Sequence, residues 1–268
     1  MNRFSYKKSG KDIILTCSDF DLDETLDCGQ AFRWEKTTSN TYKGFALNTP
    51  LTISQDGNTF TLKDTDEEKF LTVWANYFDL YTDYGEIKRR LSGDKTLASA
   101  VSFAGGIRLL RQDKWEALCS FIISQNNNIP RIKGIIGRLC EHYGEFPSYL
   151  TLSAETTDTL GFLRAGFRAK YILDAAYKLS TNELSLEEIS KMPLDNARSA
   201  LMTIKGVGPK VAECALLYGM HKTEAFPIDV WISRVMKRYY PNGLPDCTKG
   251  IEGIAQQYLF HYIRNSEK

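Results

Sequence analysis

The spacing of apolar residues changes along the chain from alternating to helical. Short apolar-rich segments, typical of β-strands, lie at residues 12–17, 31–35, 41–47, 51–54 and 59–62. Gln55–Asn58 predicts a hairpin turn between the last two. Phe70, Trp74 and Phe78 recur at helical spacing, which predicts a helix over 67–78 packed on an antiparallel sheet. From Tyr84 the pattern is helical almost to the end.

This change predicts an α+β protein with two domains. We expect a sheet domain with its helix over residues 1–95 and an all-helical domain over 96–268. Apolar residues make up 43% of the chain and charged residues 25%, as in ordinary globular proteins. No long apolar run predicts a membrane span, and no apolar segment follows the basic N-terminus as in a signal peptide. We therefore expect a cytoplasmic protein.

The segment 201–240 contains the most distinctive local pattern. A helical stretch over 196–204 is interrupted by Gly206, Val207 and Gly208, and Pro209 suits the first position of a new helix that continues to Gly219. This predicts a helix-hairpin-helix unit over about 197–219. Backbone N–H groups at such a glycine turn suit a DNA phosphate.

Lys210 and Asp229 are candidate chemical groups within this segment. Lys210 lies in the first turn after the hairpin, where the helix dipole disfavours a positive charge, and a neutral lysine amine is a nucleophile. Asp229 precedes an apolar-periodic run and is placed as its N-cap. From spacing alone, Lys210 is more often a solvated or phosphate-binding residue, and Asp229 more often only a cap.

The sequence K-G-V-G-P-K-V-A-E-C followed by P-I-D-V resembles the helix-hairpin-helix and Gly/Pro-Asp motif of base-excision DNA glycosylases. The A-E-C triplet is similar to that of the 8-oxoguanine DNA glycosylase/lyase family. The resemblance implies a TBP-like N-terminal sheet and a helical catalytic domain. It also implies that Lys210 attacks the sugar C1′ and that Asp229 is the essential acid.

Two further motifs of this family would form the pocket for the damaged base. C-G-Q-A-F-R-W places Gly29 where the family's glycine carbonyl accepts the N7–H that only the oxidised base carries. A-Q-Q-Y-L-F places Gln256 on the base edge and Phe260 on one base face, with Cys214 on the other. From the residues alone, Gly29 is a turn glycine, Gln256 a surface residue and Phe260 a core residue.

The contacts to the opposite base would come from two other stretches. S-Q-N-N-N-I-P-R resembles the family motif in which Asn126 and Arg131 contact the cytosine left by the flipped base. The stretch L-R-A-G-F-R-A-K-Y also resembles the family. There Phe167 would be the wedge in the space at the opposite base, and Arg168 a second cytosine contact. The family often has tyrosine at the wedge. The alternatives are an asparagine turn and a buried anchor at Phe167.

Neither the cysteines nor the histidines indicate a metal centre. The six cysteines are scattered without a C-x-x-C pair and are expected to be reduced, and the three histidines are isolated in sequence. We expect no metal or organic cofactor; the resemblance adds only a monovalent cation at the hairpin carbonyls. The net charge of +1 is weak evidence about nucleic acid, although basic residues outnumber acidic ones by six to three in 201–240.

The resemblance extends from Cys28 to Phe260 and implies a bifunctional repair enzyme. We expect it to excise 8-oxoguanine, preferably opposite cytosine, from duplex DNA and to cleave the strand through a Schiff base. The expected protein is a monomer at a prokaryotic nucleoid. The alternatives are a monofunctional alkylpurine DNA glycosylase, which has no use for Lys210, and a non-enzymatic helix-hairpin-helix module, which has no reason to keep Lys210, Asp229 and Gln256 together.

Overall fold

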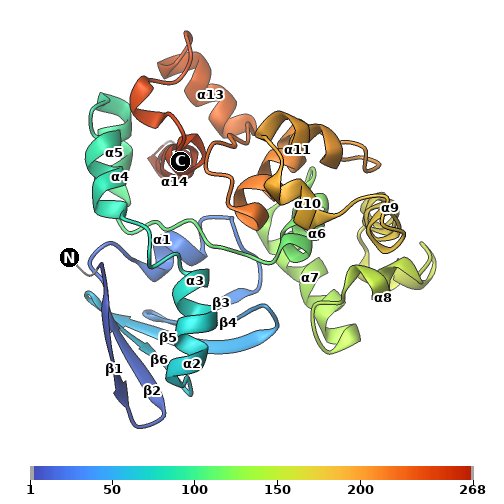
Figure 1. Ribbon diagram of the computed structural model, residues 1–268, viewed down its shortest axis with the longest axis horizontal. Coiled ribbons are helices and arrows are strands. Elements are labelled where there is room, and N and C mark those ends of the chain that lie inside the picture. The colour runs from blue at the N-terminus through green and yellow to red at the C-terminus, as the bar shows by residue number, and fades with distance from the viewer. Residues whose placement is uncertain (1–2, 267–268) are drawn as a thin grey trace. The chain divides into compact units, whose positions relative to one another are not determined.

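The computed structural model describes residues 3–266, which divide into two compact units (Figure 1). One unit combines the chain up to Arg111 with the segment that starts at Ile228, and the other is Gln112–Pro227. These units differ from the expected domains, 1–95 and 96–268. The reason is that the C-terminal helix packs on helices of the first unit, through contacts between residues far apart in sequence.

The first unit contains the antiparallel sheet expected from the sequence, with strand order β1-β2-β6-β5-β4-β3. Its strands are β1 (Ser5–Ser9), β2 (Asp12–Thr16), β3 (Trp34–Thr38), β4 (Thr41–Ala46), β5 (Thr49–Asp56) and β6 (Thr59–Leu62). Strand β1 was not expected from the apolar pattern, because its residues are polar or exposed and it pairs only with β2, at the edge of the sheet. The strand expected at 31–35 begins instead at Trp34.

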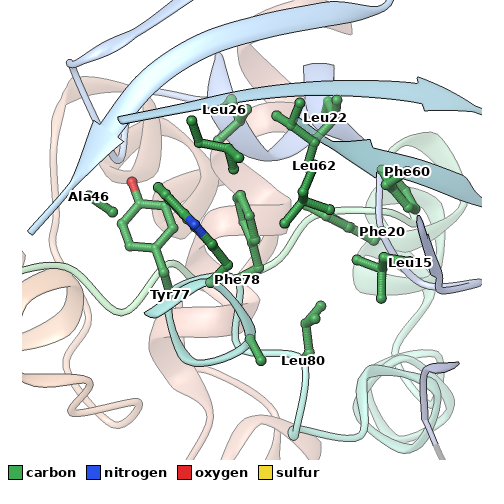
Figure 2. Packing of buried hydrophobic residues seen from close by; sticks show 14 of the residues in the cluster. Leu15, Phe20, Leu22, Leu26, Ala46, Phe60, Leu62, Tyr77, Phe78 and Leu80 are labelled. Atoms are coloured by element: carbon green, nitrogen blue, oxygen red, sulfur yellow. The ribbon is translucent and has the colours of Figure 1, made fainter. Parts of the chain in front are cut away.

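One face of the sheet is buried under the helical segment that the apolar spacing predicted. This segment consists of α2 (Glu67–Lys69), a π-helical turn (Phe70–Trp74) and α3 (Ala75–Tyr77). Phe70, Trp74 and Phe78 are fully buried. Figure 2 shows Phe78 in one cluster with Phe60 and Leu62 of β6. The four-residue spacing of the aromatic side chains therefore builds the core of this unit.

The first unit contains further helices beside the sheet and its covering segment. They are α1 (Leu22–Leu26), α4 (Tyr84–Leu91), α5 (Lys95–Phe103), α13 (Val230–Tyr239) and α14 (Glu252–Ser266), with a 3₁₀ turn at Asp246–Thr248. α14 packs against both α5 and α13. The buried Gln30 amide donates to the carbonyls of Thr25 and Arg108, at 2.9 and 2.8 Å, so the loop that precedes β3 is fixed from within.

The second unit is built around one apolar helix, α6 (Lys114–Ser124). A helix that is apolar on nearly all sides is stable only when it is enclosed. Here it packs against α7 (Ile129–Tyr143), α9 (Arg168–Ser180), α12 (Pro209–Cys214) and the π-helical turn Ala215–Gly219. The other elements are α8 (Tyr149–Ser153), a 3₁₀ turn (Thr159–Leu163), α10 (Leu186–Lys191) and α11 (Leu194–Leu201).

Two expectations about absent features can be compared with residues 3–266. No helix in this range has the length and apolar character needed to cross a membrane. The same residues contain no group of three or more His, Cys, Asp or Glu side chains arranged to hold a metal ion.

Candidate DNA-binding and catalytic site

The hairpin between α11 and α12 has the geometry that its glycines predict. Gly206 has φ +76°, a backbone conformation that residues other than glycine rarely adopt. The N–H of Val207 donates to the Ile204 carbonyl at 3.0 Å. Gly208 occupies the N-cap of α12 without a side-chain cap, and Pro209 is the first helical residue, as expected. The first N–H groups of α12 are therefore left without a capping side chain, as an anion site requires.

The hairpin is fixed to helix α9. The N–H of Lys205 donates to Asp174 Oδ2 at 2.7 Å. A Cβ added at Gly206 would lie 2.3 Å from Cε2 of Tyr171, so the glycine backbone lies directly on that ring. Phe167, at the start of the same helix, packs its ring edge-on against Tyr171 with centroids 5.6 Å apart. Sequence reasoning missed Tyr171 and Asp174, because nothing local marks them.

Lys210 lies in the first turn of α12 and is half-buried. Its Nζ is 3.5 Å from Ser124 Oγ and 5.5 Å from the centre of the Phe121 ring. In the described part of the chain, no carboxylate forms an ion pair with Lys210. An amine beside a hydroxyl and an aromatic ring, without a fixed counter-ion, is well suited to act as a nucleophile.

Asp229 is the N-cap of α13, as the sequence predicted. Its Oδ1 accepts from the N–H of Ile232 at 2.8 Å. The neighbouring Ile228 and Val230 are 52% and 72% exposed. The carboxylate of this cap is thus half-buried between two exposed apolar side chains.

The asparagine loop between α6 and α7 presents two of the expected opposite-base contacts. Asn126 is exposed and has φ +46°, and Arg131 is exposed in the first turn of α7. Asn128 caps that helix by accepting from the Arg131 N–H at 2.9 Å. The loop is thus a turn, as its composition predicts, and it also directs polar groups outward.

The two residues at the start of α9 differ sharply in exposure. Phe167 is 45% exposed, so the alternative of a buried anchor is wrong. Arg168 is 3% exposed and holds the asparagine loop, because its Nε donates to the Gln125 carbonyl and its Nη2 to the Asn126 carbonyl, both at 2.8 Å. Burial, and then the nearby charge of Arg131, lower the pKa of the Arg168 guanidinium.

The first unit brings the expected base-pocket residues of α14 close to the Cys28–Gly29 segment. Gln257 donates to the Cys28 carbonyl at 3.3 Å, and Gly29 has φ +84°. Gln256 is 4% exposed, so its assignment as a surface residue is wrong, and Phe260 is half-buried rather than core. Sequence reasoning missed Gln257, whose polar side chain in an otherwise apolar buried stretch was the available signal.

Cys214 is the last residue of α12 and is 3% exposed. It lies on the same helix as Lys210, one turn further on. None of the six cysteines forms a disulfide, as the scattered spacing predicted.

Comparisons with known proteins agree with this arrangement. Residues 12–118 match the N-terminal domain of 8-oxoguanine DNA glycosylase, and residues 119–252 match the HhH-GPD superfamily of base excision DNA repair proteins. An N-glycosylase/DNA lyase of Saccharomyces cerevisiae is 32% identical over 87% of this chain and 71% of its own. A probable N-glycosylase/DNA lyase of Methanothermobacter thermautotrophicus is 28% identical over 92% of this chain and 95% of its own.

Solved structures of DNA glycosylases resemble this chain as well. The Clostridium acetobutylicum 8-oxoguanine glycosylase/lyase, in complex with DNA containing cytosine opposite 8-oxoguanine, is 36% identical and covers the whole of both chains with a TM-score of 0.92. A 3-methyladenine DNA glycosylase of Archaeoglobus fulgidus, 19% identical with a TM-score of 0.66, shares the fold alone. The chain therefore belongs to the 8-oxoguanine DNA glycosylase family within the HhH-GPD superfamily of base excision DNA repair proteins.

Proposed function

We propose that this protein is a bifunctional glycosylase and lyase that removes 8-oxoguanine, preferably opposite cytosine, from duplex DNA. The observation that carries the proposal is Lys210, a half-buried amine beside Ser124 and Phe121 in the first turn after the glycine hairpin, with no carboxylate partner among residues 3–266. A glycosylase that uses water has no need of a lysine at this position. The family membership and the DNA complex of the Clostridium relative support the substrate.

Binding begins with the DNA backbone at the hairpin Gly206–Gly208. The N–H groups of Gly206 and Gly208 face the phosphate, because the Val207 N–H is bound to the Ile204 carbonyl and only shapes the turn. The exposed Phe167 ring wedges into the base stack, which offsets unstacking of a few kcal/mol. Asn126, Arg131 and Arg168 meet the cytosine left behind, and Arg168 also holds the Asn126 loop in place. A bidentate contact to one base is worth about 1–3 kcal/mol of discrimination.

The flipped base is contacted, in this proposal, by the Gly29 carbonyl, Gln256, Phe260 and Cys214. The carbonyl accepts the N7–H of 8-oxoguanine; with guanine it would face the N7 lone pair and stay unpaired, at a cost of about 1–3 kcal/mol. The Gln256 amide donates and accepts at the base edge, while Phe260 and Cys214 cover the two base faces.

The proposed chemistry uses the Lys210 amine and the Asp229 carboxylate. The Lys210 amine forms a bond to C1′ as the bond from C1′ to the base breaks, and the base leaves with a proton. The Asp229 carboxylate stabilises the positive charge that develops on the sugar. The C1′–O4′ bond of the sugar then breaks, O4′ takes up a proton, and the nitrogen lone pair completes the Schiff base. The Schiff base loses a proton from C2′, and the 3′ phosphate departs by β-elimination. These steps need no metal or organic cofactor, and a monovalent cation at the hairpin carbonyls is a structural part only. The protein acts as a monomer at the nucleoid.

Borohydride trapping on a duplex with 8-oxoguanine opposite cytosine tests the proposal. Borohydride reduces a Schiff base to a stable covalent adduct, so the wild type should be trapped and Lys210→Gln should not. Lys205→Gln is the matched control, because Lys205 is an exposed lysine in the same hairpin. It should be trapped like the wild type.

Other outcomes would identify the alternatives. Base release by the wild type without trapping would mean a monofunctional enzyme in which Lys210 only positions DNA. If the protein neither releases the base nor is trapped, the substrate is wrong, and alkylated purines are the next to test. Exchange of the opposite base then measures the preference for cytosine.

A further inference from the structure

Glu213 is an acid buried in the helix that carries the proposed nucleophile. It lies three residues after Lys210 on α12 and is 6% exposed. Removing a carboxylate from water is costly unless charge pairs and hydrogen bonds compensate it. The contacts of Glu213 should therefore show why an acid is kept at this position.

The two carboxylate oxygens of Glu213 bind two different segments. Oε1 accepts from Nε of Arg198, a residue of α11 whose Nη1 also binds Asp195 at 2.5 Å. Oε2 accepts from the backbone N–H of Phe226 at 2.8 Å. The first contact compensates the buried charge. The second fixes a loop.

That loop leads directly to the proposed acid. Phe226 is followed by Pro227, Ile228 and Asp229. Proline has no N–H, so the Phe226 N–H is the last backbone donor before Ile228. The Glu213 bond thus anchors this segment to α12 shortly before it reaches Asp229.

We propose that Glu213 is a positioning residue for Asp229. It holds the start of the segment that carries the acid against the helix that carries Lys210, and it does so through one hydrogen-bond acceptor. This proposal rests on the proposed function, since it assigns Glu213 a part in base excision. Removal of the acceptor should slow excision even where the protein is fully folded.

Two double variants isolate that acceptor. In Arg198→Met/Glu213→Gln and Arg198→Met/Glu213→Met the ion pair is replaced by uncharged side chains, so neither leaves a buried charge unpaired. Gln and Met have similar size and flexibility, but only Gln offers an oxygen to the Phe226 N–H. The single variant Glu213→Asp adds a second test, because it keeps the charge but is one methylene shorter.

Single-turnover excision of 8-oxoguanine opposite cytosine is the first readout. The Gln variant should stay within about threefold of the wild type, and the Met variant and Glu213→Asp should be slower by about tenfold or more, because small displacements of a catalytic group are expensive. Borohydride trapping on a DNA duplex with a preformed abasic site is the second readout. It should change little in any variant, because there the base has already left.

The proposal is overturned if the Met variant excises as fast as the Gln variant, or if Glu213→Asp matches the wild type. It also fails if abasic-site trapping falls as much as excision, because the effect would then lie in DNA binding or at Lys210. Should the Met variant not fold, as judged by circular dichroism, Glu213→Asp decides. A wild type that releases no base refutes the proposed function itself, a distinct result.

Discussion

The two hairpin glycines should differ sharply in how much the same substitution destabilises the fold. Gly206 has φ +76° and Gly208 has φ −100°. An added Cβ at Gly206 would lie 2.3 Å from Tyr171 Cε2, whereas at Gly208 no heavy atom lies within 4 Å. Alanine at these positions, two residues apart in one turn, therefore separates backbone and steric effects from the general effect of removing a glycine.

The expected magnitudes follow from these two observations. Gly206→Ala forces a left-handed conformation, at a cost of about 1–2 kcal/mol. Overlap with the Tyr171 ring adds about 1–3 kcal/mol, the usual range for overpacking. The free energy of unfolding should fall by roughly 2–5 kcal/mol in total. Gly208→Ala should change it by only about 1 kcal/mol or less, because the gain of about 0.4–1 kcal/mol from restricting the unfolded chain is offset by alanine's weakness as an N-cap.

Urea unfolding of the wild type, both variants and the double variant Gly206→Ala/Tyr171→Ala measures these terms. Tyr171→Ala alone completes the cycle and accounts for the packing that the ring itself provides. The double variant should recover the overlap, leaving mainly the backbone cost. If Gly206→Ala and Gly208→Ala lower the free energy of unfolding by the same amount, or if removal of the Tyr171 ring recovers nothing, the reasoning is refuted.

Asp229→Asn should lower base excision by about 10²–10³-fold through loss of the stabilising charge, while unfolding changes little because asparagine caps a helix as well as aspartate. Single-turnover assays and urea unfolding check this, and a parallel loss of stability would contradict it. Burial raises the pKa of the Cys28 thiol from 9.0 to about 12, so the unfolded chain loses this proton first as pH rises. The free energy of unfolding should therefore be insensitive to Cys28 below pH 9 and fall between pH 9 and 12. Cys28→Ala should make that fall shallower in a urea series across this range, and an unchanged slope would count against the burial argument.

Much of the catalytic segment could be predicted from the sequence because it depends on local rules. The left-handed backbone at Gly206, the helix start at Pro209 and the cap at Asp229 each follow from the conformational limits of one residue and its neighbours. The aromatic spacing that builds the core of the first unit is local in the same sense. Of the residues that resemble the glycosylase family, Gly206, Lys210 and Asp229 lie on these elements.

The tertiary structure decided what depends on burial and on partners distant in sequence. Gln256 is buried and Phe167 exposed, against the simplest interpretation of each. The contact of Arg168 with the Asn126 loop, and that of Glu213 with Phe226, join residues on different elements. No local pattern encodes such bonds, because the energy of a buried polar group depends on which partners the fold brings to it. The sequence thus determined the chemical groups of the site, and the packing of the helices decided which residues hold them in place.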